Sequence, residues 1–407
     1  MPFEPIAIIG RGCVLPGALS PGALWEAVSS GRDLLKPVDA DRWRLSRKNA
    51  MGTVENANDR AWSDRGGYVE GFAQIFDPEG FALPASEIMK LDPLVQWLLH
   101  TSREALQDAG VEERDRAGVI IGNLSFPSSG FSRYAERVWL GKDLADAAEI
   151  PETDARNRFM SGLPAHLLAK ALGLGDIAYA LDAACASSLY AIKLACDRLH
   201  DRSADLMLAG AVNRADDLFL HVGFCALKAL SPTGQSRPFH RDADGLVPAD
   251  GAGILVLKRL AEFDRVAMFE TPIPQHDILG NRQIRARIDR PLAMHFGSPP
   301  YVTAVREEIC DGFVVSGGAT QVLRQGTLSA EAGMPFWLQL VGNGLTTIWA
   351  AHLGAVLSHA TWPTISCINL YSHQLLKEPI VVSGGYQEVP PGPGLGIEVD
   401  EEAVARF

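Results

Sequence analysis

The first half of the chain alternates short apolar runs with amphipathic stretches. The apolar runs have the length of buried strands, and segments of helical periodicity separate several of them. This rhythm predicts an α/β fold with an inner sheet. Its strands are expected at Ile6–Ile9, Val119–Ile121, Ile177–Leu181, Asp205–Ala211 and Ile254–Leu257. Residues 43–66 are polar and weakly periodic, and we expect them to form a surface excursion.

The second half keeps a stricter order, in which each strand candidate is followed by a helical segment. The strand candidates start near Val266, Leu292, Gly312, Phe336 and Thr364. A strict β-then-α order is typical of a β/α barrel, which needs eight such units to close. We therefore expect a partial β/α barrel over residues 263–407, following a first domain over residues 1–262.

The composition narrows the class of protein. Apolar residues make up 47% of the chain, and the formal net charge of −12 comes without a basic stripe, which argues against nucleic-acid binding. No apolar run is long enough to span a membrane, and the N-terminus lacks the features of a signal peptide. The six cysteines are widely spaced and form no C-x-x-C pair. We expect a cytoplasmic protein that binds neither nucleic acid nor membrane.

The candidate nucleophile is Cys185, in the segment Asp182–Leu189 (DAACASSL). An apolar strand precedes this segment, and a helix follows whose buried face is expected to hold Leu189, Ile192, Cys196 and Leu199. Small neighbours would leave the sulfur accessible, and the positive end of the helix dipole favours the thiolate. The pattern indicates a nucleophile for acyl transfer, although a buried structural cysteine fits the same local pattern.

The segment around Cys185 resembles the active-site signature of the β-ketoacyl synthases, the thiolase-fold condensing enzymes of fatty-acid and polyketide synthesis. Further segments follow in the family's order, namely Pro5–Gly17, Asp41–Trp43, Leu83–Gly110 and Ala229–Leu260. The resemblance places Cys185 at the nucleophile's position and implies the N-terminal half of a thiolase-like layered fold. It also implies an acyl thioester on acyl carrier protein or coenzyme A as partner, no cofactor, and a homo-oligomer.

The chain also departs from this family. Ala186 stands where serine is common, and His240 and Asp250 replace the usual aspartate and glutamate. The resemblance ends near residue 262, whereas family members carry two catalytic histidines in their second half. No His-Gly-Thr and no Asn-Ile-Gly-His segment occurs in this chain. Because those histidines stabilise the enolate formed by decarboxylation, we expect Cys185 to accept an acyl group without completing a condensation.

From about Val266 the sequence resembles the C-terminal barrel of the enolase superfamily, of the mandelate racemase and muconate lactonizing type. The similar segments are Phe269–Gln275, Leu292–Pro300, Cys310–Ala319, Met334–Gly342 and Gly384–Asp400. These enzymes abstract a proton next to a carboxylate while Mg²⁺ stabilises the enediolate. The resemblance therefore raises the question of a Mg²⁺ site in the second half.

Functional groups of a β/α barrel lie at the C-terminal ends of its strands. Here those positions are Glu270, His295, Ser316, Gln339 and Asn369. Glu270 matches a metal-binding carboxylate of the family, but His295 stands where the next carboxylate is usual. The first carboxylate and the catalytic lysine belong to upstream strands that ketosynthase-like sequence replaces. Because Mg²⁺ requires several oxygen ligands, we favour a leftover polar residue over a metal ligand for Glu270.

Three functions remain open from the sequence. The leading hypothesis is an acyltransferase of the β-ketoacyl synthase class with Cys185 as nucleophile, completed by another chain where condensation occurs. The second is a non-catalytic fusion or chimeric protein that acts through association. The third is an enolase-superfamily Mg²⁺-dependent sugar-acid dehydratase or epimerase, which the missing base and first ligand disfavour. Reactivity of the thiol toward acyl thioesters separates the first hypothesis from the others.

Overall fold

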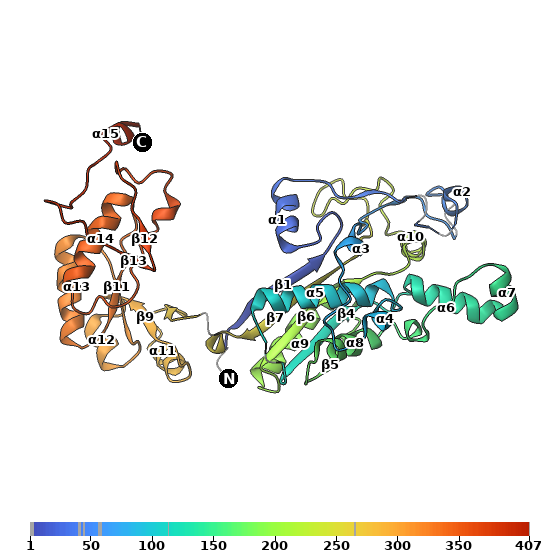
Figure 1. The fold of residues 1–407 in the computed structure, drawn as a ribbon, viewed down its shortest axis with the longest axis horizontal. Coiled ribbons are helices and arrows are strands. Elements are labelled where there is room, and N and C mark those ends of the chain that lie inside the picture. Colours follow the sequence, from blue (N-terminus) through green and yellow to red (C-terminus); the bar gives the residue numbers. More distant parts are fainter. Residues whose placement is uncertain are drawn as a thin grey trace. The chain divides into compact units, whose positions relative to one another are not determined.

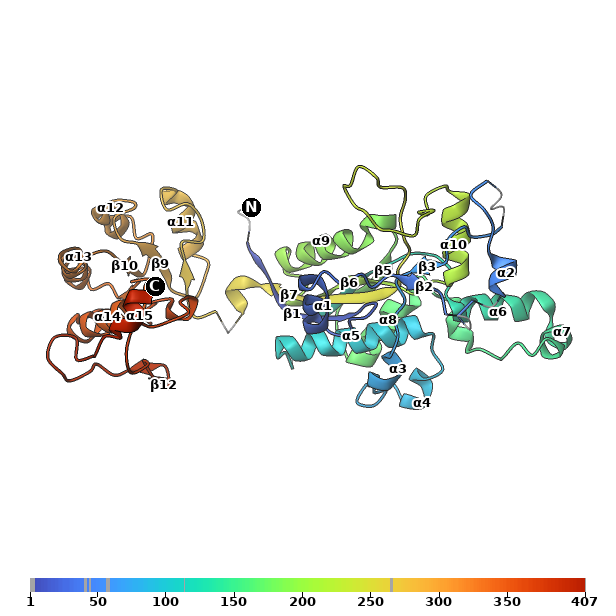
Figure 2. The same cartoon turned by 90° about the horizontal axis from the view of Figure 1, so that it is seen from above.

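The computed structural model describes residues 4–39, 42–43, 45–55, 59–112, 114–263 and 266–406. The chain divides into two compact units, Met1–Phe263 and Asp264–Phe407. Each unit has its own central sheet (Figures 1 and 2). Asp41, the first residue of the family-like segment Asp41–Trp43, lies outside the described residues. Within the described ranges, no helix is long and apolar enough to cross a bilayer.

The first unit is built on a mixed five-stranded sheet in the order β1-β7-β6-β4-β5. Its strands are β1 (Ile6–Val14), β4 (Ala117–Asn123), β5 (Ala178–Leu181), β6 (Leu206–Asn213) and β7 (Gly251–Arg259). β4 runs parallel to β5 and β6, whereas β7 runs antiparallel to both β6 and β1. Each of the five apolar runs expected as strands overlaps one of these strands, so the prediction of an inner sheet is confirmed.

Helices cover the two faces of this sheet unequally. On one face, α5 (Pro93–Ala109) and α8 (Leu163–Leu172) enclose the larger apolar core. On the other face, α9 (Ser187–His200) packs mainly over β4 and β6. Gly10 and Gly12 of β1 lie directly against the α5 backbone, where a Cβ atom would collide with helix carbonyls. These two glycines therefore serve the packing of helix on strand.

The remaining elements of the first unit lie between these layers and the surface. They are α1 (Pro21–Ser29), β2 (Lys36–Pro37), α2 (Arg47–Ala50), β3 (Arg65–Gly66), α3 (Phe72–Ile75), α4 (Ala85–Ile88), α6 (Ser129–Leu140), α7 (Lys142–Ala147), η1 (Ala155–Arg158), η2 (Ala184–Ala186), α10 (Asp217–Ala226) and η3 (Leu260–Glu262).

The expectation that residues 43–66 form only a surface excursion is wrong. Trp43, Ala50 and Ala61 are buried in a small core with Cys225 and Leu230. Their apolar partners come from a distant part of the sequence, so the mostly polar sequence of residues 43–66 does not indicate that this core forms.

The second unit contains a parallel four-stranded sheet in the order β11-β10-β9-β8. The strands are β8 (Phe269–Glu270), β9 (Leu292–His295), β10 (Gly312–Val315) and β11 (Phe336–Leu338). The helices that follow them in turn are α11 (Ile278–Arg285), α12 (Tyr301–Arg306), α13 (Ala319–Glu331) and α14 (Gly344–Val356). The strict β-then-α order is confirmed, and the described sheet is open, as in a partial barrel.

The fifth strand expected near Thr364 is much shorter than predicted. Ile365 forms a parallel bridge with Gln339, donates its N–H to the Leu338 carbonyl at 2.9 Å and accepts the N–H of Leu340 at 3.1 Å. Cys367 then adopts a left-handed conformation with φ of +54°, and the extended pairing ends there. The chain continues through η4 (Ile368–Leu370), the hairpin of β12 (Val382–Ser383) and β13 (Tyr386–Gln387), and α15 (Glu401–Arg406). The predicted fifth strand is therefore present only as a short extended segment beside β11.

The two faces of the second sheet bury different side chains. The face toward the helices holds the main apolar core, which includes Phe313, Phe336 and Met294. On the opposite face, Ala293, Val314 and Trp337 are buried beneath Met268 and Trp362. The ring centroids of Trp337 and Trp362 lie 5.6 Å apart. In a closed barrel, this face of the sheet would point into the interior and would be covered by side chains from the other strands. Here Trp362 covers it instead.

Candidate active site

Cys185 lies in η2, the short turn that joins β5 to α9. Asp182 begins this turn, and its carboxylate accepts the backbone N–H of Ala184 at 2.9 Å and that of Ser125 at 3.0 Å. These two donors lower the pKa of the Asp182 carboxyl below its ordinary value. Because Ser125 follows β4, the carboxylate fastens the turn to the loop of the neighbouring strand.

The backbone immediately before the cysteine is strained. Ala184 has φ of +50°, a left-handed conformation that costs a residue with a Cβ about 1–2 kcal/mol. The buried Ser187 hydroxyl holds this conformation, since it accepts the N–H of Ala183 at 2.9 Å and donates to the Ala184 carbonyl at 2.7 Å. Ser187 itself packs against Gly122 of β4, where a Cβ would collide with it. The turn is therefore held on both sides of Cys185.

The side chain of Cys185 is exposed, so the alternative of a buried structural cysteine does not hold. Among the six cysteines, Cys13, Cys225 and Cys310 are buried, and Cys196 and Cys367 are partly buried. Burial raises the pKa of the Cys310 thiol to about 12 and also raises the pKa of Cys196. Of the six thiols, the one at the apex of the β5–α9 turn is thus the most accessible to a large reagent.

The buried face of α9 differs from the expected one. Its buried residues are Ser187, Ala191, Ala195 and Leu199, which recur at every fourth position. Leu189, which was expected on this face, is 69% exposed. Of the other expected residues, Leu199 is buried, and Ile192 and Cys196 are partly buried against the same core. The expectation is therefore wrong for Leu189 alone, and the small side chains at the centre of the buried face allow α9 to lie close to β4 and β6.

A buried charged cluster that sequence reasoning missed lies elsewhere in the first unit. Arg42 forms ion pairs with Asp217, at 2.5 Å, and with Asp250. Asp250 also accepts the N–H of Val69 at 2.7 Å, and burial raises the pKa of its carboxyl. Asp250 was noted as a departure from the family, but nothing local indicated its partners. His240, the other departure, is exposed.

The structure brings together two of the candidate residues of the second unit. Glu270 ends β8 and His295 ends β9, and the two strands are parallel neighbours. His295 Nε2 lies 2.9 Å from Glu270 Oε1, and both side chains are partly exposed. Ser316 and Gln339 follow β10 and β11 as expected. Asn369 is the exception, because it is exposed in η4 rather than at the end of a strand.

The donor set at Glu270 does not fit Mg²⁺. A hard cation of this kind takes several oxygen ligands, and the carboxylate of Glu270 is paired with an imidazole instead. Within the described part of the chain, no group of three or more His, Cys, Asp or Glu side chains could hold a metal ion. The described residues around Glu270 therefore do not form the oxygen-rich ligand set that Mg²⁺ requires.

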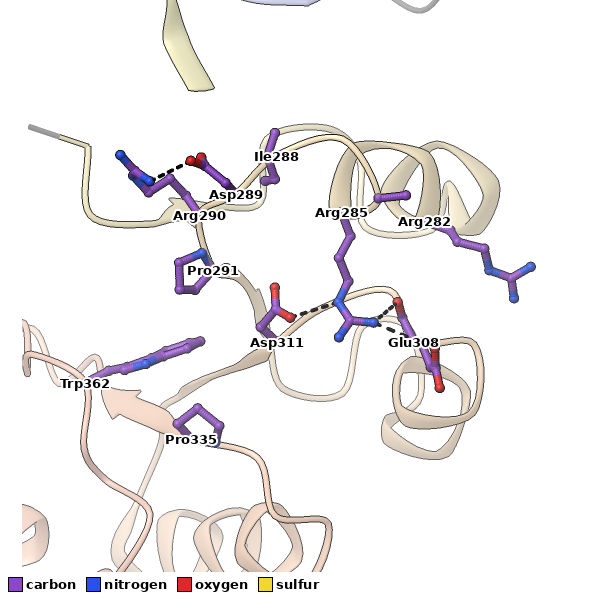
Figure 3. Close-up of a pocket in the computed structure, with 11 residues that line it drawn as sticks. Arg282, Arg285, Ile288, Asp289, Arg290, Pro291, Glu308, Asp311, Pro335 and Trp362 are labelled. Atoms are coloured by element: carbon purple, nitrogen blue, oxygen red, sulfur yellow. Dashed lines mark hydrogen bonds and ion pairs between the residues drawn. The ribbon is translucent and has the colours of Figure 1, made fainter. Parts of the chain in front are cut away.

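A cavity of about 680 Å³ in the second unit lies at the other ends of the strands. Its lining includes Pro291, Asp311 and Pro335, each of which comes just before a strand (Figure 3). Each of its three arginines forms an ion pair with a carboxylate of the same unit. Figure 3 shows one of these pairs, in which Arg285 Nε lies 2.9 Å from the Asp311 carboxylate. This cavity is thus separate from the Glu270–His295 pair, and its charges are already compensated.

Comparison with protein families gives two matches along the chain. Residues 3–262 match the beta-ketoacyl synthase N-terminal domain, and residues 233–403 match the enolase C-terminal domain-like family. The two matches overlap across β7. In the structure this strand pairs with β1 and β6, and the buried Arg259 at its end donates to the carbonyls of Leu199 and Ala204. The overlapping strand is therefore part of the first sheet.

Characterised relatives resemble the first unit. The chain is 34% identical over 260 residues to a phenolphthiocerol/phthiocerol polyketide synthase of Mycobacterium tuberculosis, covering 64% of this chain and 14% of that protein. It is 36% identical over 267 residues to a mycocerosic acid synthase-like polyketide synthase of Mycolicibacterium smegmatis, covering 64% of this chain and 12% of that protein. The chain therefore spans only a small part of the length of these relatives.

Solved structures show the same fold. The PfaC keto synthase–chain length factor matches with a TM-score of 0.60 and 26% identity, covering 83% of this chain and 39% of that one. A ketosynthase from module 6 of the bacillaene synthase of Bacillus subtilis 168 matches with a TM-score of 0.51 and 22% identity, covering 82% and 56%. Through its first unit, whose family match spans more than half of the sequence, the chain belongs to the beta-ketoacyl synthase family.

Proposed function

We propose that the first unit takes an acyl group from a thioester of acyl carrier protein or coenzyme A onto Cys185. The observation that supports this most strongly is the exposed Cys185 at the apex of a turn held by Asp182 and Ser187. The Cys185 sulfur attacks the acyl carbonyl carbon as its S–H proton departs. The bond from that carbon to the carrier sulfur then breaks, and the carrier leaves as a thiol that carries the proton.

The proposed reaction ends at the acyl-enzyme in this chain alone. Condensation with a malonyl unit requires groups that stabilise the enolate released by decarboxylation. In this sequence the family's two histidine segments do not occur, and enolase-like sequence follows the first unit. Groups from outside this sequence would have to stabilise the enolate for a complete ketosynthase reaction.

We also propose a homodimer formed through β5 in the reducing cytoplasm. Within the described residues, β5 pairs with β4 on one side only, so it forms an edge of the first sheet. An edge strand presents unpaired N–H and C=O groups that can pair with the same strand of a second copy. Because β5 leads into the Cys185 turn, such pairing would bring the two nucleophilic turns of a dimer near one interface.

The experiment that tests the acylation step is intact-mass analysis of the full chain after incubation with octanoyl-coenzyme A. We expect one octanoyl adduct, located on the peptide that contains Cys185. Cys185→Ala should abolish the adduct, and Cys196→Ala, a matched change on the following helix, should retain it. An adduct that persists in Cys185→Ala, or no adduct on the wild-type chain, would show that Cys185 is not the acyl acceptor.

A further inference from the structure

One face of the first sheet is only partly covered. On that face α9 lies over β4 and β6, and Ile8 of β1 is 63% exposed although it lies within the paired part of that strand. A cavity of about 570 Å³ lies over β1, β7 and β6, between α1 and α9. Its lining is largely apolar and includes Cys13, Leu24, Trp25, Ile192 and Leu255, together with Arg11. We call this surface the β1–β7 groove.

The helix that borders the groove exposes apolar side chains beside it. In α1, Ala27 is buried, whereas Trp25 is 72% exposed and Val28 is 66% exposed. Both residues line the groove. A tryptophan buries a large apolar area when it enters a contact, and contiguous exposed apolar surface of this kind marks an interaction site. The β1–β7 groove and the exposed apolar side chains of Trp25 and Val28 therefore lie on the same surface. Such side chains could fill the groove of another molecule.

Two side chains of opposite charge lie in or next to the groove. Arg11 lines the groove, and within the described residues no carboxylate lies within 4.0 Å of its guanidinium; Asp108 instead accepts its backbone N–H at 3.0 Å. Glu26, next to Trp25 on α1, likewise has no basic side chain within ion-pair distance among the described residues. A surface that presents both a cation and an anion can pair with a copy of itself across a two-fold axis.

We propose that a second copy of this chain docks on the β1–β7 groove. Trp25 of each protomer enters the groove of the other, and Arg11 of each pairs with Glu26 of the other. This contact uses β1, β7 and α1, so it is separate from the edge of β5 and goes beyond the proposed acyl transfer. The apolar floor supplies the driving force, and the reciprocal charge pair selects a second copy over an unrelated apolar partner.

The test measures the mass of the full chain by light scattering across a concentration series. Trp25→Glu should halve the assembled mass, whether the wild-type chain is a dimer or a larger assembly that also uses β5. Arg11→Glu and Glu26→Arg should each raise the dissociation constant about tenfold, and the double variant should restore it because the pair is reversed. Trp139→Glu, which changes an 87% exposed tryptophan on α6, is the matched control and should leave the mass unchanged.

Two results would overturn this proposal. One is an assembled mass that Trp25→Glu does not alter, including a wild-type chain that is monomeric throughout. The other is a double variant that dissociates as readily as the single ones, because a partner other than a second copy would not carry the compensating change. Acylation of Cys185 is measured separately by mass, so a failure here is distinguishable from a failure of the proposed function.

Discussion

The backbone N–H of Ser125 donates to Asp182 Oδ2 over 3.0 Å and so fastens the loop after β4 to the turn that carries Cys185. The other contacts that hold this turn come from Ala183, Ala184 and Ser187. All of them belong to the first unit. The geometry around Cys185 is therefore assembled locally, and the exchange of the family's second half for an enolase-like unit leaves these contacts in place.

The first prediction concerns Asp182→Asn. Because the pKa of Asp182 is lowered, its carboxylate stabilises the folded turn above the ordinary value of 3.8, and this contribution is lost as the pH falls through the lowered pKa. We expect the variant to lose at most about 1 kcal/mol at neutral pH, since the carboxylate is exposed. A urea titration with pulsed hydrogen exchange on peptides of β5 and α9 measures this loss. If the variant's loss in free energy of unfolding grew as the pH fell below 3.8, the ionised carboxylate of Asp182 would not be what stabilises the turn.

The second prediction concerns the buried hydroxyl of Ser187. Ser187→Ala leaves the Ala183 N–H and the Ala184 carbonyl without their partner, which we expect to cost about 1–3 kcal/mol. Because Ala184 is then free to leave its left-handed conformation, acylation of Cys185 should also slow. Time-resolved intact mass gives the rate. Ser188→Ala, one residue further along α9, is the control, and equal effects of the two changes would mean that the hydroxyl of Ser187 does not hold the turn.

The third prediction concerns Arg259, which is 2% exposed. Its guanidinium donates to the carbonyls of Leu199 and Ala204 and forms ion pairs with Asp205 and Glu262. We expect Arg259→Ala to destabilise the first unit by about 1–3 kcal/mol for each buried carbonyl that loses its donor.

Arg116 provides the control for that change. It also contacts Asp205, at 2.7 Å, but is 57% exposed. Arg116→Ala should therefore cost less than about 1 kcal/mol in the same urea titration, read on peptides of β6 and β7. Similar losses for the two arginines would show that Arg259 does not hold the end of β7 in the first sheet.

The fourth prediction concerns the second unit and divalent cations. Since Glu270 is paired with His295 and belongs to no metal-binding cluster among the described residues, we expect calorimetric titration with Mg²⁺ to give no saturable heat. Treatment with a chelator should leave the thermal unfolding of the chain unchanged. Saturable Mg²⁺ binding that Glu270→Gln abolishes would contradict this reading of the site.

The fold could be predicted from sequence where one local signal sufficed. Apolar runs marked the strands of both units, because a strand buried on both faces needs apolar side chains along its length. The buried face of α9 was found only in part, since Leu199 is buried as expected but Ala191 and Ala195, at the centre of that face, pack through their small size rather than their hydropathy. The core around Trp43 also escaped prediction, because Cys225 and Leu230 lie far along the chain.

The candidate site was predictable to a similar degree. Cys185 stood out because a strand, a run of small residues and a helix surround it in sequence. Its support by Ser125 is contributed by another strand's loop, 57 residues from Asp182 in sequence, and no local pattern reports such a contact. The sequence placed Glu270 and His295 at the ends of successive strands, but it did not predict the contact between their side chains. The strand expected near Thr364 is shorter than predicted because Cys367 leaves the extended conformation.

The measurement that tests the central claim most directly is mass analysis of the Cys185 peptide after octanoyl-coenzyme A and then malonyl-coenzyme A are added to the full chain. Local contacts support nucleophilicity of Cys185, whereas enolate stabilisation needs the family's missing histidines. We predict that the octanoyl adduct forms on Cys185, survives the addition of the malonyl thioester, and gives no β-ketoacyl product. An unmodified Cys185 would contradict the nucleophile, and a condensed product would contradict the claim that acylation and condensation are separated in this chain.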